Sequence, residues 1–258
     1  MKRLHLPLLL LLAVSLGFTA CSDDDGNAPA TKATVALSLT DAPADYEAVN
    51  ITFSEVALSM NGGWVVLSGE SQTINLLEWN NGKSIELGRE DVDPGKITQI
   101  RLMVTEATVT VDGQTHDVTI PSAEQTGLKL VTNFDLVAGS TYEFVVDFDA
   151  TASIVTTGNH QNPNGYKLKP TIRVEDKATT GSISGTVENF TDTPQAFAMQ
   201  NGSAVTSTPI DVNTGAFRLA YLAPGTYTVE IMDGTAMVSE ENVTVTAGQD
   251  NNIGTLSF

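Results

Sequence analysis

Two aspartates two positions apart, Asp147 and Asp149, are the residues best placed to bind a cation. The alternating run 142–149 predicts a strand, so both carboxylates project from one face, about 7 Å apart, while Phe148 points the other way. Calcium takes about six to eight oxygen ligands, which loop oxygens would complete. The sequence therefore predicts a calcium site at Asp147 and Asp149, with solvated acid at a strand end as the alternative. No other cofactor is predicted.

Residue patterns that indicate catalysis are sparse. His116 lies beside a predicted hairpin and His160 in a loop rich in Gly, Asn and Pro, and neither belongs to a spaced metal motif. The sequence has no G-x-S-x-G motif for a nucleophilic serine. We predict a protein that is not an enzyme, and a carboxylate pair of the kind that glycosidases use is the remaining route to hydrolysis.

Three aromatic residues near predicted turns are candidates for binding a ligand. Trp64 follows two glycines, Trp79 precedes Asn80, and Tyr166 belongs to the loop that contains His160. A flat ring in such a position could stack on a sugar. Core packing at the end of a β-sandwich is the alternative, and it is the commoner use of both tryptophans.

Cys21, the only cysteine, follows a short hydrophobic leader. Lys2 and Arg3 form a positive segment, residues 6–16 are apolar, and small residues precede Cys21. The pattern resembles a bacterial lipoprotein signal, which implies removal of residues 1–20 and a lipid on Cys21 that anchors the chain to a membrane. An ordinary secretory peptide is the alternative, whereas a transmembrane anchor would need about 20 apolar residues.

The residues directly after the cysteine are Ser22, Asp23, Asp24 and Asp25. They resemble the acidic export tag that some Gram-negative lineages place there, which implies an outer-membrane lipoprotein exposed on the cell surface. The periplasmic face of that membrane is the alternative address. Residues 21–33 lack hydrophobic periodicity, so they also predict an acidic, flexible tether.

The amino-acid composition limits the classes of partner that the protein can bind. The full chain carries 13 Lys and Arg against 31 Asp and Glu, and loss of Lys2 and Arg3 with the leader leaves a net charge of −20. Repulsion by phosphates excludes a general nucleic-acid binder. The hydrophobic content of 41% in regular alternation predicts a packed core rather than disorder. With Cys21 lipidated, no disulfide can form, so packing alone must hold the fold.

The alternation of apolar and polar residues predicts strands almost throughout, hence an all-β protein. In the run 142–149, one face is expected to be buried and the other wet. A slip of the alternation at Ser54 and Glu55 predicts a β-bulge. Asn61-Gly62, Asn81-Gly82 and Asp112-Gly113 each predict a β-hairpin turn.

Small polar residues at 177–181 interrupt the pattern and predict a linker between two antiparallel β-sandwich domains, residues 34–176 and 182–258. The larger domain resembles the family catalogued as domain of unknown function 4382, found in bacterial lipoproteins. The segments that carry this resemblance are residues 35–43, 49–53, 95–102, 127–130, 147–150 and 168–170. The family implies an architecture and an address but no activity.

The smaller domain is marked by Gly185-Thr186-Val187, by residues 211–217 and by residues 222–229. It resembles the carboxypeptidase-regulatory, or transthyretin-like, sandwich, a module that acts as a spacer or accessory binder. Tyr227, Val229 and Ile231 are expected to face its core.

Three functions follow, in order of preference. The first is a non-catalytic surface binding or adhesion lipoprotein that is tethered by the lipid on Cys21. The smaller domain would be a spacer, and the loops of the larger domain would contact a glycan or protein. The second is a structural or accessory subunit of an outer-membrane assembly. A hydrolase that uses Asp147 and Asp149 is third.

Overall fold

The computed structural model describes residues 31–42, 44–121, 127–159 and 162–258. Most of these residues form β-strands, and one short α-helix, α1, spans Ala150–Ser153. The predicted all-β sandwich fold is confirmed. Two separate clusters of buried apolar side chains form the cores, one before residue 170 and one after residue 182.

The first part of the chain packs a four-stranded sheet, in the order β12-β9-β1-β5, against a larger sheet. The larger sheet runs β10-β11-β7-β6-β2-β3, and β4 and β8 also pair with its central strands. The strands are β1 Ala33–Ala42, β2 Ala48–Met60, β3 Gly63–Ser68, β4 Gln72–Asn75, β5 Ile85–Val92, β6 Gly95–Val111, β7 Gln114–Thr119, β8 Leu128–Leu136, β9 Thr141–Asp149, β10 Ile154–Asn159, β11 Asn162–Leu168 and β12 Ile172–Asp176. We call this part the large domain.

The remaining strands form a second sandwich, the small domain, from the sheets β16-β13-β19 and β15-β14-β17-β18. Tyr227, Val229 and Ile231 are at most 3% exposed in its core, as predicted. A 3-10 turn at Lys177–Thr179 joins the domains. The strands are β13 Gly181–Glu188, β14 Gln195–Gln200, β15 Ser203–Pro209, β16 Ala216–Leu222, β17 Gly225–Asp233, β18 Ala236–Val245 and β19 Asp250–Ser257.

The sheets are mainly rather than wholly antiparallel. Among the described strands, β1 pairs with β9, β7 with β11 and β13 with β19 in parallel. The predicted antiparallel sandwiches thus also contain these three parallel pairs. A parallel pair requires a long crossover, and β1 and β9 are separated in the chain by β2 to β8, most of which belong to the larger sheet.

Local turn predictions were right where the two flanking strands pair. Asn61 (φ 51°) and Gly62 (φ 79°) turn β2 into β3, and Asp112 and Gly113 turn β6 into β7. The predicted bulge also appears, as a register shift between Phe53 and Glu55 against β6. Asn and Gly tolerate the positive φ that a tight hairpin needs, which explains why these signals are reliable.

The prediction of a hairpin at Asn81-Gly82 was wrong. The pair does adopt positive φ values of 56° and 79°, but the strands on either side belong to different sheets, since β4 pairs with β2 and β5 with β1. The turn instead reaches the small domain. Turn chemistry is local, whereas the partner of a strand is decided by tertiary packing.

The prediction that one face of β9 is exposed to solvent was also wrong. Val145 and Asp147 are 0% and 6% exposed, and their neighbours Ser38 and Thr40 on β1 are buried as well. The 3-10 turn after β12 and the small domain cover this face. The central strands of the four-stranded sheet are therefore buried on both sides.

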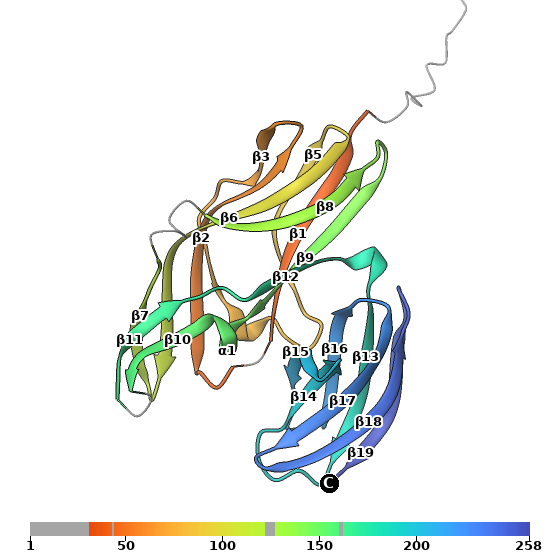
Figure 1. Ribbon diagram of the computed structural model, residues 1–258. Coiled ribbons are helices and arrows are strands. Elements are labelled where there is room, and N and C mark those ends of the chain that lie inside the picture. The colour runs from red at the N-terminus through yellow and green to blue at the C-terminus, as the bar shows by residue number, and fades with distance from the viewer. Residues whose placement is uncertain (1–30, 43, 122–126, 160–161) are drawn as a thin grey trace, which may run out of the picture.

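Figure 1 shows the two domains placed one after the other. The described chain enters at the end of the large domain that is farther from the small domain. The C-terminus lies at the opposite end of the molecule, on the small domain (Figure 1).

Candidate functional site at the domain junction

Arg173 and Asp147 meet on the covered face of the four-stranded sheet. They are register partners in the antiparallel pair of β12 and β9, so their side chains leave the same face. Nε of Arg173 donates to Oδ2 of Asp147 at 2.7 Å, and its Nη2 lies 2.6 Å from the same oxygen. Thr206 of the small domain also donates to this oxygen, at 3.1 Å. One carboxylate oxygen thus receives hydrogen bonds from both domains.

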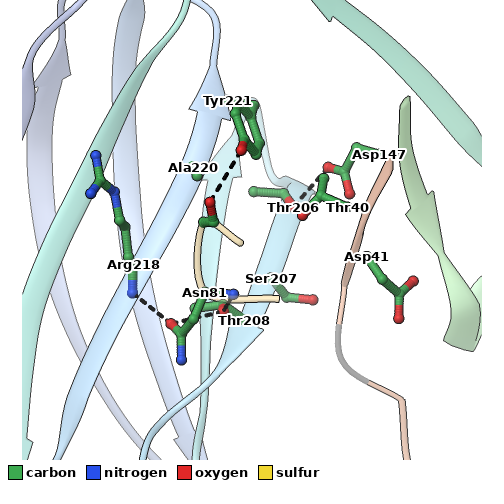
Figure 2. Close-up of a pocket in the computed structure, with 11 residues that line it drawn as sticks. Thr40, Asp41, Asn81, Asp147, Thr206, Ser207, Thr208, Arg218, Ala220 and Tyr221 are labelled. Carbon is green, nitrogen blue, oxygen red and sulfur yellow. Dashed lines mark hydrogen bonds between the residues drawn. The ribbon is translucent and has the colours of Figure 1, made fainter. Parts of the chain in front are cut away.

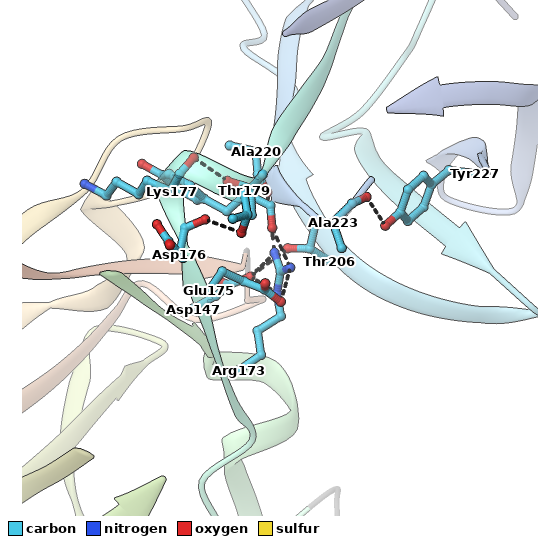
Figure 3. A network of polar contacts seen from close by, with 12 residues as sticks. Asp147, Arg173, Glu175, Asp176, Lys177, Thr179, Thr206, Ala220, Ala223 and Tyr227 are labelled. Atoms are coloured by element: carbon cyan, nitrogen blue, oxygen red, sulfur yellow. Dashed lines mark hydrogen bonds and ion pairs between the residues drawn. The ribbon is translucent and has the colours of Figure 1, made fainter. Parts of the chain in front are cut away.

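The guanidinium of Arg173 continues into the small domain (Figure 3). Nη1 donates to the carbonyl of Tyr221 at 2.7 Å, and Nη2 to that of Ala220 at 3.4 Å. Tyr221 has a φ of 55°, which is rare for an aromatic residue and marks a bulge in β16, where the register against β13 shifts. This local strain turns two carbonyls toward a cation, which indicates that the bulge positions the junction.

Asn81 forms the second group of contacts across the junction (Figure 2). Its backbone N–H donates to Oγ1 of Thr208 at 3.1 Å, and its Oδ1 accepts from Thr208 and from the backbone N–H of Arg218. Its Nδ2 donates to the carbonyl of Pro209 at 3.1 Å. Tyr221 donates to the carbonyl of Gly82, also at 3.1 Å. Both the oxygen and the nitrogen of the Asn81 side-chain amide thus bond to the small domain.

A small polar cavity lies among these residues. Its volume is about 10 Å³, close to the least that holds a single water. Thr40 and Asp147 line it from the large domain, and Thr206, Thr208 and Tyr221 from the small domain (Figure 2). This cavity is too small for an organic substrate. A second cavity, of about 170 Å³, shares Asp147 and Thr206 with it and is also lined by Asp149 and Arg173.

Asp41 is a buried acid beside this cavity. Its Oδ1 accepts a hydrogen bond from the N–H of Ala150 at 3.0 Å, whereas Oδ2 has no partner among the described residues. Burial raises the pKa of Asp41 well above its ordinary value, the Ala150 N–H opposes this, and the charges of Asp147 and Asp149 raise it further. Burial also raises the pKa of Glu175, against the lowering effect of Arg173.

The two aspartates of the predicted calcium site have separate contacts. Asp147 is bonded to Arg173, and Oδ1 of Asp149 accepts the N–H of Ala152 at 2.8 Å, which caps α1. In the described part of the chain, no group of three or more His, Cys, Asp or Glu could hold a metal. Calcium at Asp147 and Asp149 stays a prediction.

The three candidate aromatics are not brought together. Trp64 is 40% exposed on β3, with the guanidinium of Arg101 4.0 Å from its ring centroid. Trp79 packs against the large core, and Tyr166 is 6% exposed, with its ring 5.4 Å from that of His116. Their ligand-binding role stays a prediction, and only Trp64 offers a ring to a ligand.

Several predicted features lie outside the described residues. These are the leader 1–20, lipidation at Cys21, the export signal Ser22, Asp23, Asp24 and Asp25, and His160. Within the described chain, every helix is too short or too polar to cross a membrane.

Sequence reasoning missed Arg173, Asn81 and Tyr221 as junction residues. Asn81-Gly82 did carry a signal, as a turn, but nothing near it in the sequence indicates its partner. Arg173 lies in an alternating run like many others, so its pairing with Asp147 depends on a strand register that the sequence does not reveal.

Several solved structures are similar to this chain at low TM-scores. The Bacillus anthracis TIE protein shares 10% identity at a TM-score of 0.23, with 88% of this chain and 34% of that chain covered. BcpA, the major pilin subunit of Bacillus cereus, shares 10% identity at 0.22, with 87% and 69% covered. A fimbrial protein from Bacteroides ovatus ATCC 8483 shares 10% identity at 0.22, with 89% and 50% covered. This chain thus spans about a third of the TIE protein and half of the fimbrial protein.

Among curated proteins, none matches this sequence. A family model does match, over residues 32–170, which is more than half of the chain and includes Asn81, Asp147 and most strands of the large domain. The chain therefore belongs to the family described as Domain of unknown function (DUF4382).

Proposed function

We propose that this chain is a lipid-anchored, non-catalytic binding or adhesion protein, displayed on the surface of a Gram-negative outer membrane. One observation carries the proposal: the described chain enters at one end of the molecule, and the small domain lies at the other (Figure 1). A lipid on Cys21 would anchor the entry end, since two or more acyl chains bind a membrane stably. The small domain and the junction would then face away from the membrane.

The contacts at the junction support a display role. Domains joined only by a linker move relative to one another by default. Here Arg173 and Asn81 bond across the junction, and each uses more than one hydrogen bond. A molecule held in this way keeps its small domain in a fixed position relative to its large domain.

The same contacts support a protein without catalysis. Asp147 is one of the two carboxylates that a hydrolase would use. Its Oδ2 already accepts hydrogen bonds from Arg173 and Thr206. A general acid or base must exchange its proton with substrate. A carboxylate held in an ion pair with Arg173 is poorly suited to that task.

Anchoring is tested with the full chain expressed in a Gram-negative host. We expect the protein in the outer-membrane fraction, with external protease removing it from intact cells. Cys21→Ser should release it into the soluble fraction, and replacing Asp23, Asp24 and Asp25 with Ala should protect it from protease. Membrane attachment that survives Cys21→Ser would refute the lipid anchor, and protection of the unaltered protein would refute surface display.

Binding is tested separately, with the detergent-purified full chain on an array of polysaccharides and glycoproteins. Saturable binding is expected, and its loss in chelator would support calcium at Asp147 and Asp149. Absence of binding by a folded protein would contradict the binding role.

A second candidate, an accessory subunit of an outer-membrane assembly, is favoured by one surface. Register pairs Trp64 with Ser59, Ser59 with Gln99 and Gln99 with Val131, so Trp64 and Val131 lie on the same face of the larger sheet. They are 40% and 85% exposed. Exposed apolar residues on one face can mark a protein contact. Co-purification of an outer-membrane complex, lost in Trp64→Ala, would support this candidate.

A further inference from the structure

A larger cavity opens at the domain junction, next to Asn81. Its volume is about 470 Å³, within the range of roughly 300–1,000 Å³ that is typical of ligand clefts. Residues 44–47, Leu77 and Asn80 form its wall on the large domain, and residues 193–195, 209, 210 and 212 form its wall on the small domain. Neither domain forms this cleft alone. We call it the junction cleft.

The junction cleft is acidic. Asp45 and Glu47 line it, and among the described residues no Lys, Arg or His does. The carboxylate of Glu47 accepts the N–H of Gly113 at 3.0 and 3.2 Å, so its charge is partly engaged. Asp45 is exposed and forms no ion pair with any described residue. A cation is therefore the charge that this cleft favours.

The rest of the lining is largely apolar. Leu77, Pro194, Pro209 and Ile210 contribute to it, and Val212 stands 54% exposed at the cleft. Lysine and arginine side chains combine an apolar stem with a charged end, and they bury the stem while the charge stays at a polar rim. Apolar walls with a free carboxylate match that side-chain chemistry better than they match a simple metal ion.

The width of the junction cleft is set by contacts already described. Asn81 follows Asn80 of one wall, and its Nδ2 holds the carbonyl of Pro209 of the other wall at 3.1 Å. Figure 2 shows Asn81 lying against Thr208. A cleft that is formed before binding saves the ligand the cost of ordering it.

We propose that the junction cleft binds an extended peptide segment of another protein that carries a lysine or arginine flanked by apolar residues. The cationic end pairs with Asp45, and the apolar stem and neighbours pack on Leu77, Ile210 and the prolines. This inference deepens the binding role proposed above and rests on it.

The test uses the full chain in detergent and two peptides that carry fluorescein on the N-terminal amine, fluorescein-Leu-Lys-Leu-amide and fluorescein-Leu-Glu-Leu-amide, with fluorescence anisotropy as the readout. We expect saturable binding of the lysine peptide only, weakened by added salt. Asp45→Asn should weaken it about fivefold, the most that a single exposed ion pair contributes. Val212→Arg, which fills the cleft with a cation, should abolish it. Glu240→Gln, an equal loss of charge at an exposed position of β18, is the matched control and should change nothing.

Equal binding of the two peptides, equal effects of Asp45→Asn and Glu240→Gln, or no binding at all would overturn the inference. A glucosamine oligosaccharide serves as a competitor, and tighter binding of that sugar than of the lysine peptide would also overturn it. The same variants are run on the polysaccharide and glycoprotein array. Array binding that is unaffected by Asp45→Asn would show that the junction cleft is not the binding site. The proposed binding function would still stand.

Discussion

Nη2 of Arg173 lies 2.6 Å from Oδ2 of Asp147, and the same guanidinium donates to the backbone of the small domain. The side chains are 21% and 6% exposed. Removing one partner of a buried pair leaves a charge without compensation. We therefore expect Arg173→Met to lower the free energy of unfolding by about 3 kcal/mol, measured by urea denaturation.

The control for that change is Arg89→Met. Arg89 pairs with Glu86 at 2.8 Å, but the two side chains are 44% and 47% exposed. Exposed pairs contribute less than about 1 kcal/mol. Equal losses in the two variants would show that Arg173 does not act through burial at the junction.

Asn81→Ala should uncouple the domains. It removes the side-chain hydrogen bonds to Thr208, Pro209 and Arg218, each with a net contribution of about 1 kcal/mol. Because each domain has its own core, calorimetry should then resolve two unfolding transitions in place of one. Asn201→Ala is the control, since Asn201 has a similar φ of 52° in a turn within the small domain. A single transition in Asn81→Ala would contradict coupling through this loop.

Asp41 should make stability fall as pH rises. Burial raises its pKa in the folded protein, so the native state keeps a proton that the unfolded chain releases near pH 4. The free energy of unfolding should therefore decrease from that pH up to the folded pKa. Asp41→Asn should remove this contribution, as measured by denaturant titration at a series of pH values. Glu175 has a shift of the same sign and is present in both proteins, so the difference between them isolates Asp41.

Asp211→Asn serves as a comparison, because the pKa of Asp211 is shifted in the opposite direction to that of Asp41. Hydrogen bonds from the N–H groups of Asn213 and Thr214 lower the pKa of Asp211. Its contribution to stability is present at neutral pH and is lost as pH falls through the folded pKa. If the two variants shifted the pH profile in the same direction, the assignment of Asp41 as a raised-pKa acid would be wrong.

Trp64 and Tyr166 should respond differently to truncation. Tyr166 is 6% exposed in the large core, so Tyr166→Ala should cost about 3 kcal/mol or more of stability. Trp64 is 40% exposed, and Trp64→Ala should cost about 1 kcal/mol, mainly its contact with Arg101. Urea denaturation measures both. A larger loss in Trp64→Ala would assign that ring to the fold rather than to a contact surface.

The local structure could be predicted from the sequence, because it depends on neighbouring residues. Alternation predicts the strands, Asp112-Gly113 predicts its hairpin, and the slip at Ser54 and Glu55 predicts its bulge. The junction could not be predicted in this way. Asn81 and Thr208 are 127 positions apart, and neither belongs to a pattern that specifies the other.

Burial of the second face of β9 has the same explanation. Asp147 occupies a polar position of an alternating strand, which predicts exposure to solvent. Its low exposure depends on Arg173, which neutralises it, and on the small domain, which covers it. The burial of Asp147 therefore follows from the strand register and from the docking of a second domain. Neither can be predicted from the residues around Asp147.

Strand β13 opens the small domain, yet its parallel neighbour is β19, at the far end of the chain, with Ser182 opposite Asp250. Contacts between residues so distant in sequence form slowly, because the entropy cost of closing a long loop comes before any stabilisation by the contacts. The small domain cannot complete its folding until β19, a strand of eight residues, has docked against β13. A chain that loses β19 would leave β13 as an open template for other chains, so the final strand also guards against aggregation.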